Sequence, residues 1–422
     1  MGWNGRRVLG AVVVGAAIVA STAGPVGATP GDLDPTFSGD GMAVTKFNQG
    51  AYAETVALQS DRKIVVGGYT SPVGGNEAWA LVRFLPDGTL DQTFGKQGRV
   101  VTNWTGADDE LWGLVVLGND KIVAAGSASG QMAVARYTRS GFLDTTFGGG
   151  DGEVTIDFTP SHDRAWDIQT APGGKLVVAG QAGPASQSMV ALARLKPGGA
   201  LDHSFSGDGM ATEDVNGLSS LAWDVLVQAD GSIVAAGAAN GATDKTMVTK
   251  FTEAGEVDTS FGENGSWVAT SPGNAYANAI VQLASGKYMV AAAVGSFPYD
   301  VGLFRFLATG REDDTFGASG LVAHDFGGSE TPTDLRLVGT RLVVSLTETP
   351  VASSSFSAAV ARMQPSGAPD TAFGDQGLAV SGLTRSRGDA LAIQANGRIL
   401  VVGPAYGSGQ TGRFGATRFL RT

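Results

Sequence analysis

The chain has 422 residues, of which 43% are hydrophobic, 63 are glycine and none is cysteine. This composition excludes a disordered protein, because Val, Ile, Leu and Phe are plentiful, and it excludes disulfides, thiolate metal sites and a Cys nucleophile. The formal charge of −11 excludes the basic surface that binding to nucleic acid or to an anionic membrane requires.

The N-terminal segment has the pattern of an export signal. Arg6 and Arg7 precede an apolar stretch over residues 8–20, and Val26-Gly27-Ala28 fits a cleavage site with small residues. We predict a signal peptide over residues 1–28. Its removal would leave a secreted, extracellular chain over residues 29–422, with a formal charge of −13 and no further membrane insertion.

One short phrase recurs along the rest of the chain: a leucine-like residue, Asp, any residue, Thr or Ser, then Phe. We call it the Asp–Phe phrase. It first reads Leu33-Asp34-Pro35-Thr36-Phe37 and returns, with small variations, at intervals of 53 to 58 residues. A fixed period of this size is typical of a repeat architecture. The seven aspartates of the phrase are Asp34, Asp91, Asp144, Asp202, Asp258, Asp313 and Asp370.

Each repeat contains four predicted strands. In the first complete unit they cover residues 54–59, 63–69, 79–85 and 98–104, separated by turns and by one loop that is rich in Gly and Pro. No window of useful length shows helical periodicity. Four antiparallel strands that recur seven times predict an all-β fold, a seven-bladed β-propeller; a β-solenoid is the main alternative, but its rungs are usually shorter.

The two ends of the chain support a closed ring. Residues 41–47 form a strand that precedes every complete unit, and the last unit stops after its third strand, near residues 414–420. The N-terminal strand therefore completes the last blade. Closure removes two exposed sheet edges, so we expect residues 29–422 to form a single domain and a monomer.

The repeat resembles the bacterial delta-60 repeat family. The units of that family carry a hairpin similar to Asp61-Arg62-Lys63-Ile64-Val65-Val66, a strand similar to Ala135-Arg136-Tyr137, and a phrase similar to Leu143-Asp144-Thr145-Thr146-Phe147-Gly148. The strand order is also similar, more weakly, to NHL-type propellers. The resemblance covers residues 33–420. It implies a secreted or surface protein and no defined reaction.

The recurring side chains have structural explanations. We predict that the phrase phenylalanines are wedges between blades, because each buries a large apolar area. Each phrase Asp is predicted to meet the basic residue of a third strand, and ring closure then pairs Asp34 with Arg418. The seven basic residues are Arg83, Arg136, Arg194, Lys250, Arg305, Arg362 and Arg418.

Function is expected where the repeats differ, on the face that carries the fourth-to-first and second-to-third loops. One equivalent position near the start of each inner strand varies strongly. It holds Glu54, Trp112, Trp166, Trp223, Asn278 and Asp389 in six units, and in the sixth unit, which is shortened at its turn, the count points to Asp334. The three tryptophans are either a stacking platform for a sugar or plain packing between blades. The acidic arc of Glu54, Asn278 and Asp389, with Asp334 as its fourth candidate, is an alternative site for a divalent cation over the central channel, an arrangement similar to that of propeller lactonases.

Three functions remain open. The first is a secreted, non-catalytic binding protein, without a cofactor, that recognises a polysaccharide, a peptide or a surface partner. The second is a metal-assisted hydrolase, lactonase or lyase at the mouth of the channel, which would need a divalent cation. The third is a purely structural surface protein. Nucleophilic catalysis has little support, because no Gly-x-Ser-x-Gly elbow is present.

Overall fold

A computed structural model describes residues 28–48, 50–71, 75–104, 107–160, 162–240, 244–269, 274–351, 353, 355–383, 385–407 and 411–421. Residues 1–27, which hold nearly all of the predicted signal peptide, lie outside the described residues. In the described part, no helix has the length and apolar character needed to span a membrane.

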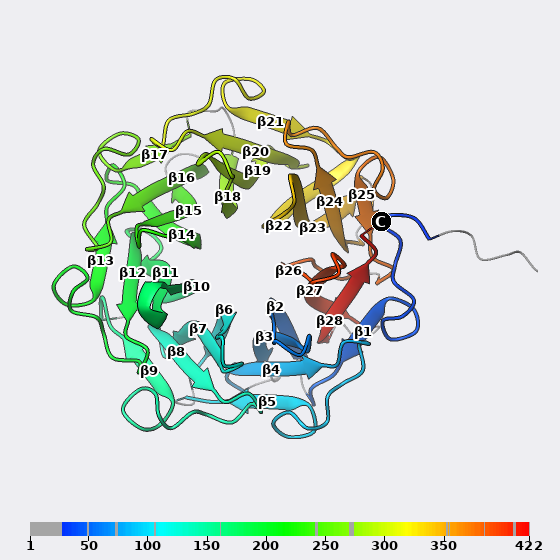
Figure 1. Cartoon of the computed structure of the whole chain (residues 1–422), viewed down its shortest axis with the longest axis horizontal. Coiled ribbons are helices and arrows are strands. Elements are labelled where there is room, and N and C mark those ends of the chain that lie inside the picture. The colour runs from blue at the N-terminus through cyan, green and yellow to red at the C-terminus, as the bar shows by residue number, and fades with distance from the viewer. Residues whose placement is uncertain are drawn as a thin grey trace, which may run out of the picture.

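Seven four-stranded antiparallel sheets form a ring around a central channel (Figure 1), which confirms the seven-bladed β-propeller. Each blade runs from an innermost first strand to an outermost fourth strand. Blade 1 comprises β2 (Gly50–Leu58), β3 (Ile64–Ser71), β4 (Ala78–Phe84) and β5 (Arg99–Thr102). Blade 2 comprises β6 (Asp109–Val116), β7 (Ile122–Ala128), β8 (Gln131–Tyr137) and β9 (Glu153–Ile156). Blade 3 comprises β10 (Arg164–Ala171), β11 (Lys175–Ala182), β12 (Met189–Leu195) and β13 (Met210–Glu213), with a 3₁₀ turn at Pro172–Gly174.

The remaining four blades repeat this arrangement. Blade 4 comprises β14 (Ser219–Val227), β15 (Ile233–Asn240), β16 (Asp244–Phe251) and β17 (Ser266–Val268). Blade 5 comprises β18 (Asn274–Gln282), β19 (Tyr288–Gly295), β20 (Asp300–Phe306) and β21 (Leu321–His324). Blade 6 comprises β22 (Gly328–Val338), β23 (Arg341–Pro350), β24 (Ser357–Met363) and β25 (Leu378–Val380). Blade 7 comprises β26 (Ala390–Ile393), β27 (Ile399–Tyr406), β28 (Gly412–Phe419) and the N-terminal β1 (Met42–Thr45).

The ring closes as the sequence predicts. Strand β1 pairs antiparallel with β28, in a register that joins Met42 to Thr417 and Thr45 to Phe414. The N-terminal strand is therefore the outermost strand of blade 7. Figure 1 shows the blue and red ends of the chain in the same blade.

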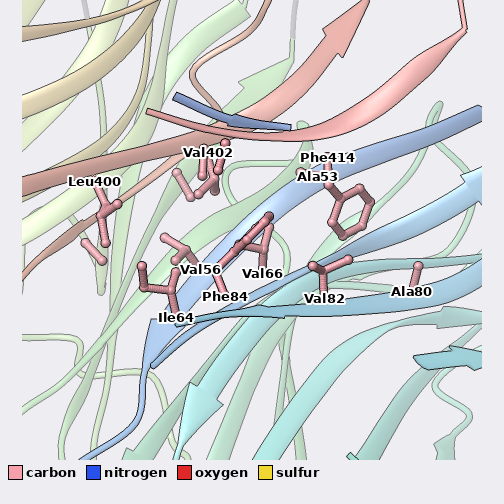
Figure 2. Close-up of a cluster of buried hydrophobic side chains, with 14 of the residues drawn as sticks. Ala53, Val56, Ile64, Val66, Ala80, Val82, Phe84, Leu400, Val402 and Phe414 are labelled. Carbon is pink, nitrogen blue, oxygen red and sulfur yellow. The ribbon is translucent and has the colours of Figure 1, made fainter. Parts of the chain in front are cut away.

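Buried side chains fill the spaces between neighbouring blades. Figure 2 shows the cluster at the closure, where Val56, Val66 and Val82 of blade 1 meet Leu400 and Phe414 of blade 7. Comparable clusters occupy the other interfaces of the described ring. Burial of one such side chain contributes about 1.5–3 kcal/mol, so the hydrophobic core lies between the blades and holds the ring together.

The phrase phenylalanines are buried wedges, as predicted: all seven are at most 2% exposed. Phe37, for example, packs against Gly88 in a turn of the next blade. A Cβ atom at Gly88 would lie 2.8 Å from the ring, and the φ of +88° also favours glycine there. The seven wedges are Phe37, Phe94, Phe147, Phe205, Phe261, Phe316 and Phe373.

The predicted ring of Asp–base pairs is present in every blade. Arg418 Nε lies 2.7 Å from Asp34 Oδ2, although 384 positions separate the two residues. The other pairs are Arg83–Asp91, Arg136–Asp144, Arg194–Asp202, Lys250–Asp258, Arg305–Asp313 and Arg362–Asp370, at 2.6–3.2 Å.

In six of these pairs the Asp also contacts a second basic residue, which lies at the beginning of the second strand of the blade. In blade 1, Lys63 Nζ lies 3.2 Å from Asp91 Oδ2. Burial alone would raise the pKa of Asp91, but hydrogen bonds from Thr93 and the cations Lys63 and Arg83 lower it to about 2. These carboxylates therefore stay ionised in the folded protein.

Candidate functional site

A β-bulge at the same place in the innermost strand aims one side chain of each blade at the channel. The bulge is present in β2, β6, β10, β14, β18 and β22, and such bulges typically redirect a side chain. In blade 7 the equivalent residue is Asp389, which directly precedes β26 and donates its N–H to Val402 O at 2.8 Å. The bulged residues are Glu54, Trp112, Trp166, Trp223, Asn278 and Thr333.

Glycines in the second strand accompany the bulge. A Cβ atom at Gly68 would lie 1.9 Å from Tyr52 O, and one at Gly126 would lie 2.0 Å from Glu110 O. At these two positions a Cβ atom would clash with the bulged strand. Blades 5 and 6 form the same bulge with Ala292 and Leu346 at the equivalent position, so a mid-strand glycine accompanies the bulge in blades 1 to 4 but is not required for it.

The structure corrects the predicted position in the sixth unit. Thr333, and not Asp334, is the bulged residue of β22. The reason is the turn between the first two strands, which is one residue shorter in blade 6. Leu58 pairs with Ile64 in blade 1, whereas Leu337 pairs with Leu342 in blade 6.

All seven of these side chains line one cavity of about 380 Å³ in the channel. The six residues predicted from the sequence are therefore brought together, although they come from six different blades. The position next to the bulge adds Asp167, Asp224 and Asp334 to the lining, and Arg336 and Arg387 add two guanidinium groups.

Aromatic rings form the wall on blades 2 to 4, where Trp112, Trp166 and Trp223 line the cavity. The ring centroids of Trp112 and Trp166 lie 4.4 Å apart at an interplanar angle of 41°, and those of Trp223 and Tyr276 lie 5.8 Å apart. The guanidinium of Arg164 lies 5.6 Å from the Trp112 ring centroid. None of the three tryptophans belongs to the buried clusters found between the described parts of the blades.

Charged groups form the opposite wall, on blades 7 and 1. Arg387 makes a two-pronged ion pair with Asp389, with Nε 3.0 Å from Oδ1 and the terminal nitrogen Nη2 2.9 Å from Oδ2. The same terminal nitrogen lies 3.4 Å from Glu54 Oε2. Burial, and then the charge of Asp389, raise the pKa of Glu54 well above its usual value, and Arg387 offsets this only in part.

The predicted acidic arc thus has a different composition. Glu54 and Asp389 meet around Arg387, so the cation beside these carboxylates is a side chain of the protein itself. Asn278 is engaged elsewhere, because its amide donates to Pro332 O at 2.6 Å. This geometry fits a fixed ion pair better than a cage of six to eight oxygens for a divalent cation.

Three aspartates, each next to a bulge in its innermost strand, accept hydrogen bonds from the backbone of a neighbouring blade. Asp224 Oδ2 accepts the N–H of Ile280 at 2.7 Å, and Asp334 Oδ2 accepts that of Leu391 at 3.0 Å. Asp167 Oδ2 accepts the N–H of Val225 at 3.2 Å. The sequence analysis did not assign these roles, because the acceptor and the donor lie more than 50 positions apart.

Arg336 lies among these aspartates at the floor of the cavity. A terminal nitrogen of its guanidinium is 2.9 Å from Asp334 Oδ1. Burial lowers the pKa of Arg336, but the charges of Asp334, Asp224 and Asp167 outweigh it and raise the pKa above its usual value. Its side chain keeps 42% of its surface accessible, which faces the cavity. Burial, and then the charge of Asp167, raise the pKa of Asp224 well above its usual value.

A separate acidic cluster lies outside the cavity, on blades 5 and 6. Carboxylate oxygens of Asp300, Asp325 and Glu330 lie within 4.8 Å of one another. Glu330 is fully buried and accepts the N–H of Gly328 at 2.9 Å. Burial raises the pKa of Glu330 to about 7, the N–H donors of Phe326 and Gly328 lower it in part, and the charges of Asp325 and Asp300 raise it further.

The change Glu330→Gln should therefore stabilise the protein at pH 8 and not at pH 4. The folded protein holds the Glu330 proton more tightly than the unfolded chain does, so the native protein loses stability as the pH rises from about 4.5 to about 7. A neutral Gln avoids this loss, and the variant should gain about 2 kcal/mol above pH 7. Urea unfolding of both proteins at several pH values measures the difference; Glu263→Gln, at an exposed position, should show none.

Comparison with known proteins supports the class of fold. The family described as a domain of unknown function (DUF5122) beta-propeller matches residues 59–94, 117–147, 172–205 and 228–261. Each matched segment spans the second and third strands of a blade and ends at the Phe of the Asp–Phe phrase. No curated protein matches the chain.

Solved structures are similar to this chain at low sequence identity. Virginiamycin B lyase from Staphylococcus aureus, an inactive variant with quinupristin, is 10% identical over 90% of this chain and 99% of that chain, with a TM-score of 0.51. The polysaccharide lyase Uly1 is 10% identical over 89% and 90%, with a TM-score of 0.49. Drosophila Semaphorin 2a is 7% identical over 90% and 75%, with a TM-score of 0.48. At such identities the likeness concerns the fold alone.

Proposed function

We propose that the protein is a secreted, non-catalytic binding propeller that holds a sugar unit of a polysaccharide in the channel cavity. One observation carries the proposal. The seven positions at which the repeats differ converge on one cavity, with tryptophan rings on one wall and hydrogen-bonding charged groups on the other. Pockets of this size with an apolar wall and a few convergent polar groups are typical ligand sites.

The position of the tryptophans favours a platform over packing. They line the cavity and are only partly buried, whereas the wedges between blades are other residues. The close contact of Trp112 with Trp166 joins two indole rings into one surface.

The charges of the cavity restrict the class of sugar. Five carboxyl groups line it, those of Glu54, Asp167, Asp224, Asp334 and Asp389, against the two guanidinium groups of Arg336 and Arg387. Burial raises the pKa of Glu54 and of Asp224, so these two groups carry less negative charge, but the other three carboxyl groups still outnumber the two guanidinium groups and disfavour a uronic acid. Neutral sugars and amino sugars therefore fit the cavity better than acidic sugars do.

The resemblance to the delta-60 repeat family and the predicted signal peptide support the extracellular part of the proposal. A carbohydrate outside the cell is the ligand that a secreted protein of this kind would meet. Closure of the ring by β1 supports a monomeric receptor, because it leaves no unpaired strand at the join.

An enzyme is the second candidate, and Glu54 favours it. Its raised pKa keeps the proton on the carboxyl to higher pH than usual, which suits a general acid that protonates a leaving group. The change Glu54→Gln separates the two functions. A binding protein should keep its affinity within about threefold, whereas a hydrolase or lyase should bind its substrate and lose turnover.

The change Trp112→Ala should weaken sugar binding at least tenfold, as should Trp166→Ala, because each removes part of the stacking surface. The protein over residues 29–422 is screened on an array of neutral, amino and acidic glycans, and affinities are then measured by calorimetry. Phe142→Ala, at an exposed aromatic residue outside the cavity, is the control and should bind normally. Variants that fold normally and bind normally would contradict the proposal, and variants that unfold would assign the tryptophans to packing.

A further inference from the structure

A second cavity lies at the outer rim of the ring, beside the closure, and is separate from the channel. It measures about 610 Å³ and is lined by residues 46–48 after β1, residues 95–97 and 99–101 before and in β5, and residues 141–142 of blade 2. We call it the rim groove. Figure 1 shows β1 and β5 at the outer edge of neighbouring blades. A smaller hollow of about 190 Å³ continues past Lys46 and adds Arg413.

The residues that distinguish the rim groove depart from the repeat. Arg99 begins the outermost strand of blade 1, and no other outermost strand begins with a basic residue. Phe142 precedes the phrase of blade 2, where no other repeat has an aromatic residue. Residues that differ from the equivalent residues of the other repeats do not take part in the packing that all repeats share, so they are candidates for binding. The first residues of the other outermost strands are Met42, Glu153, Met210, Ser266, Leu321 and Leu378.

The positive charge of the groove is not neutralised within the described structure. Arg99 donates to Lys46 O at 2.9 Å, Gln97 O at 3.0 Å and Thr45 Oγ1 at 3.2 Å, which are all neutral acceptors. The Asp–base ring, in contrast, pairs each of its arginines with a carboxylate. Among the described residues, no Asp or Glu lines the groove. Lys46, Lys96 and Arg99 thus form a basic patch on a chain whose net charge is −11.

Apolar side chains are exposed beside these cations. Phe142 is 62% exposed and Val101 is 54% exposed, although both are large and hydrophobic. Exposed apolar groups that gather at one place mark interaction sites. An aromatic ring suits a sugar as well as a peptide, but valine offers nothing to sugar hydroxyls. The combination therefore favours a peptide over an anionic polysaccharide.

We propose that the rim groove binds an acidic peptide segment of a partner protein. An apolar side chain of the segment packs against Phe142 and Val101, and its carboxylates pair with Lys46, Lys96 and Arg99. Charge complementarity at an exposed rim accelerates association and weakens as salt screens it. The groove would attach the ring to a protein partner while the channel cavity stays open to its own ligand.

The test uses the protein over residues 29–422 and an array of immobilised hexapeptides that vary in acidic and apolar content. Peptides with two or more acidic residues and one large apolar residue should bind best, and affinity should fall at least tenfold between 50 and 500 mM NaCl. Lys96→Glu and Phe142→Ser should each weaken binding at least tenfold. The matched controls are Lys196→Glu and Phe297→Ser, at exposed positions outside the groove, and they should bind normally.

Three results would overturn the proposal. They are no preference for acidic peptides on the array, equal binding by the Lys96→Glu variant, and tighter binding of a tetragalacturonate probe than of any peptide. Glycan binding at the channel provides the independent readout. Lys96→Glu should leave it unchanged, so failure of the rim-groove proposal and failure of the channel proposal are distinguishable.

Discussion

The change Arg418→Met should lower the free energy of unfolding by about 3 kcal/mol, whereas Lys250→Met should lower it by about 1 kcal/mol. The first removes a cation from a buried pair, in which the side chains of Arg418 and Asp34 are 3% and 1% exposed. Removal of one partner leaves a buried charge without compensation, which typically costs 3–5 kcal/mol. Arg398, 2.9 Å from Asp34, remains and softens the loss.

The pair of Lys250 and Asp258 is a matched comparison, because it occupies the same position in blade 4 as Arg418 and Asp34 do in blade 7, and its side chains are less buried. The side chains of Lys250 and Asp258 are 18% and 21% exposed, so water compensates for much of the lost attraction. Met preserves much of the apolar stem that packs beneath each cation, and Arg418 lies over the Phe37 ring at 4.6 Å. Urea unfolding followed by Trp fluorescence measures both changes. Equal losses in the two variants would show that burial does not govern the ring of pairs.

Deletion of residues 29–47 should abolish the folded monomer. The deletion removes β1, the fully buried Phe37, and the partner of Arg418. It also removes the bond from Gly374 N to Pro30 O at 2.8 Å, which ties blade 6 to the N-terminal segment. Strand β28 would then present an open edge, and an open edge of this kind promotes aggregation or strand exchange.

Size-exclusion chromatography with light scattering compares the proteins that begin at residue 29 and at residue 48. The shorter protein should aggregate or elute as an exchanged oligomer, and a synthetic peptide of residues 29–47 should restore a monomer when it is added in excess. A shorter protein that is monomeric and melts within about 3 °C of the longer one would show that the closure contributes little.

The fold could be predicted because the same short pattern of residues recurs in every repeat. Each repeat buries its second and third strands, so these strands read as apolar, and the phrase needs Asp for its turn and Phe for its wedge. Blade number, strand order and the pairing of Asp34 with Arg418 could all be counted from this pattern, and the structure confirms them. The first and last residues of each strand could not be predicted from the pattern, because turns and strand ends share the same small residues.

The candidate site was predicted in part, for a reason that its residues make clear. Counting from the repeat found six of the seven positions that face the channel, since equivalent positions in the repeats occupy equivalent places in the ring. Thr333 was missed because one shorter turn shifts the count. The pairing of Arg387 with Asp389 and Glu54, and the position of Arg336 among three aspartates, depend on rotamers that no spacing specifies.

The sequence by itself determined a closed ring of seven blades, because burial is periodic and the extra strand at the N-terminus matches the strand that the last unit lacks. Only the tertiary structure decided what the ring holds at its centre and at its rim. Side chains from blades that are more than 50 residues apart meet across the channel, and residues of three blades meet in the rim groove. Contacts of that kind depend on the closure of the whole ring, and a local pattern of residues does not record them.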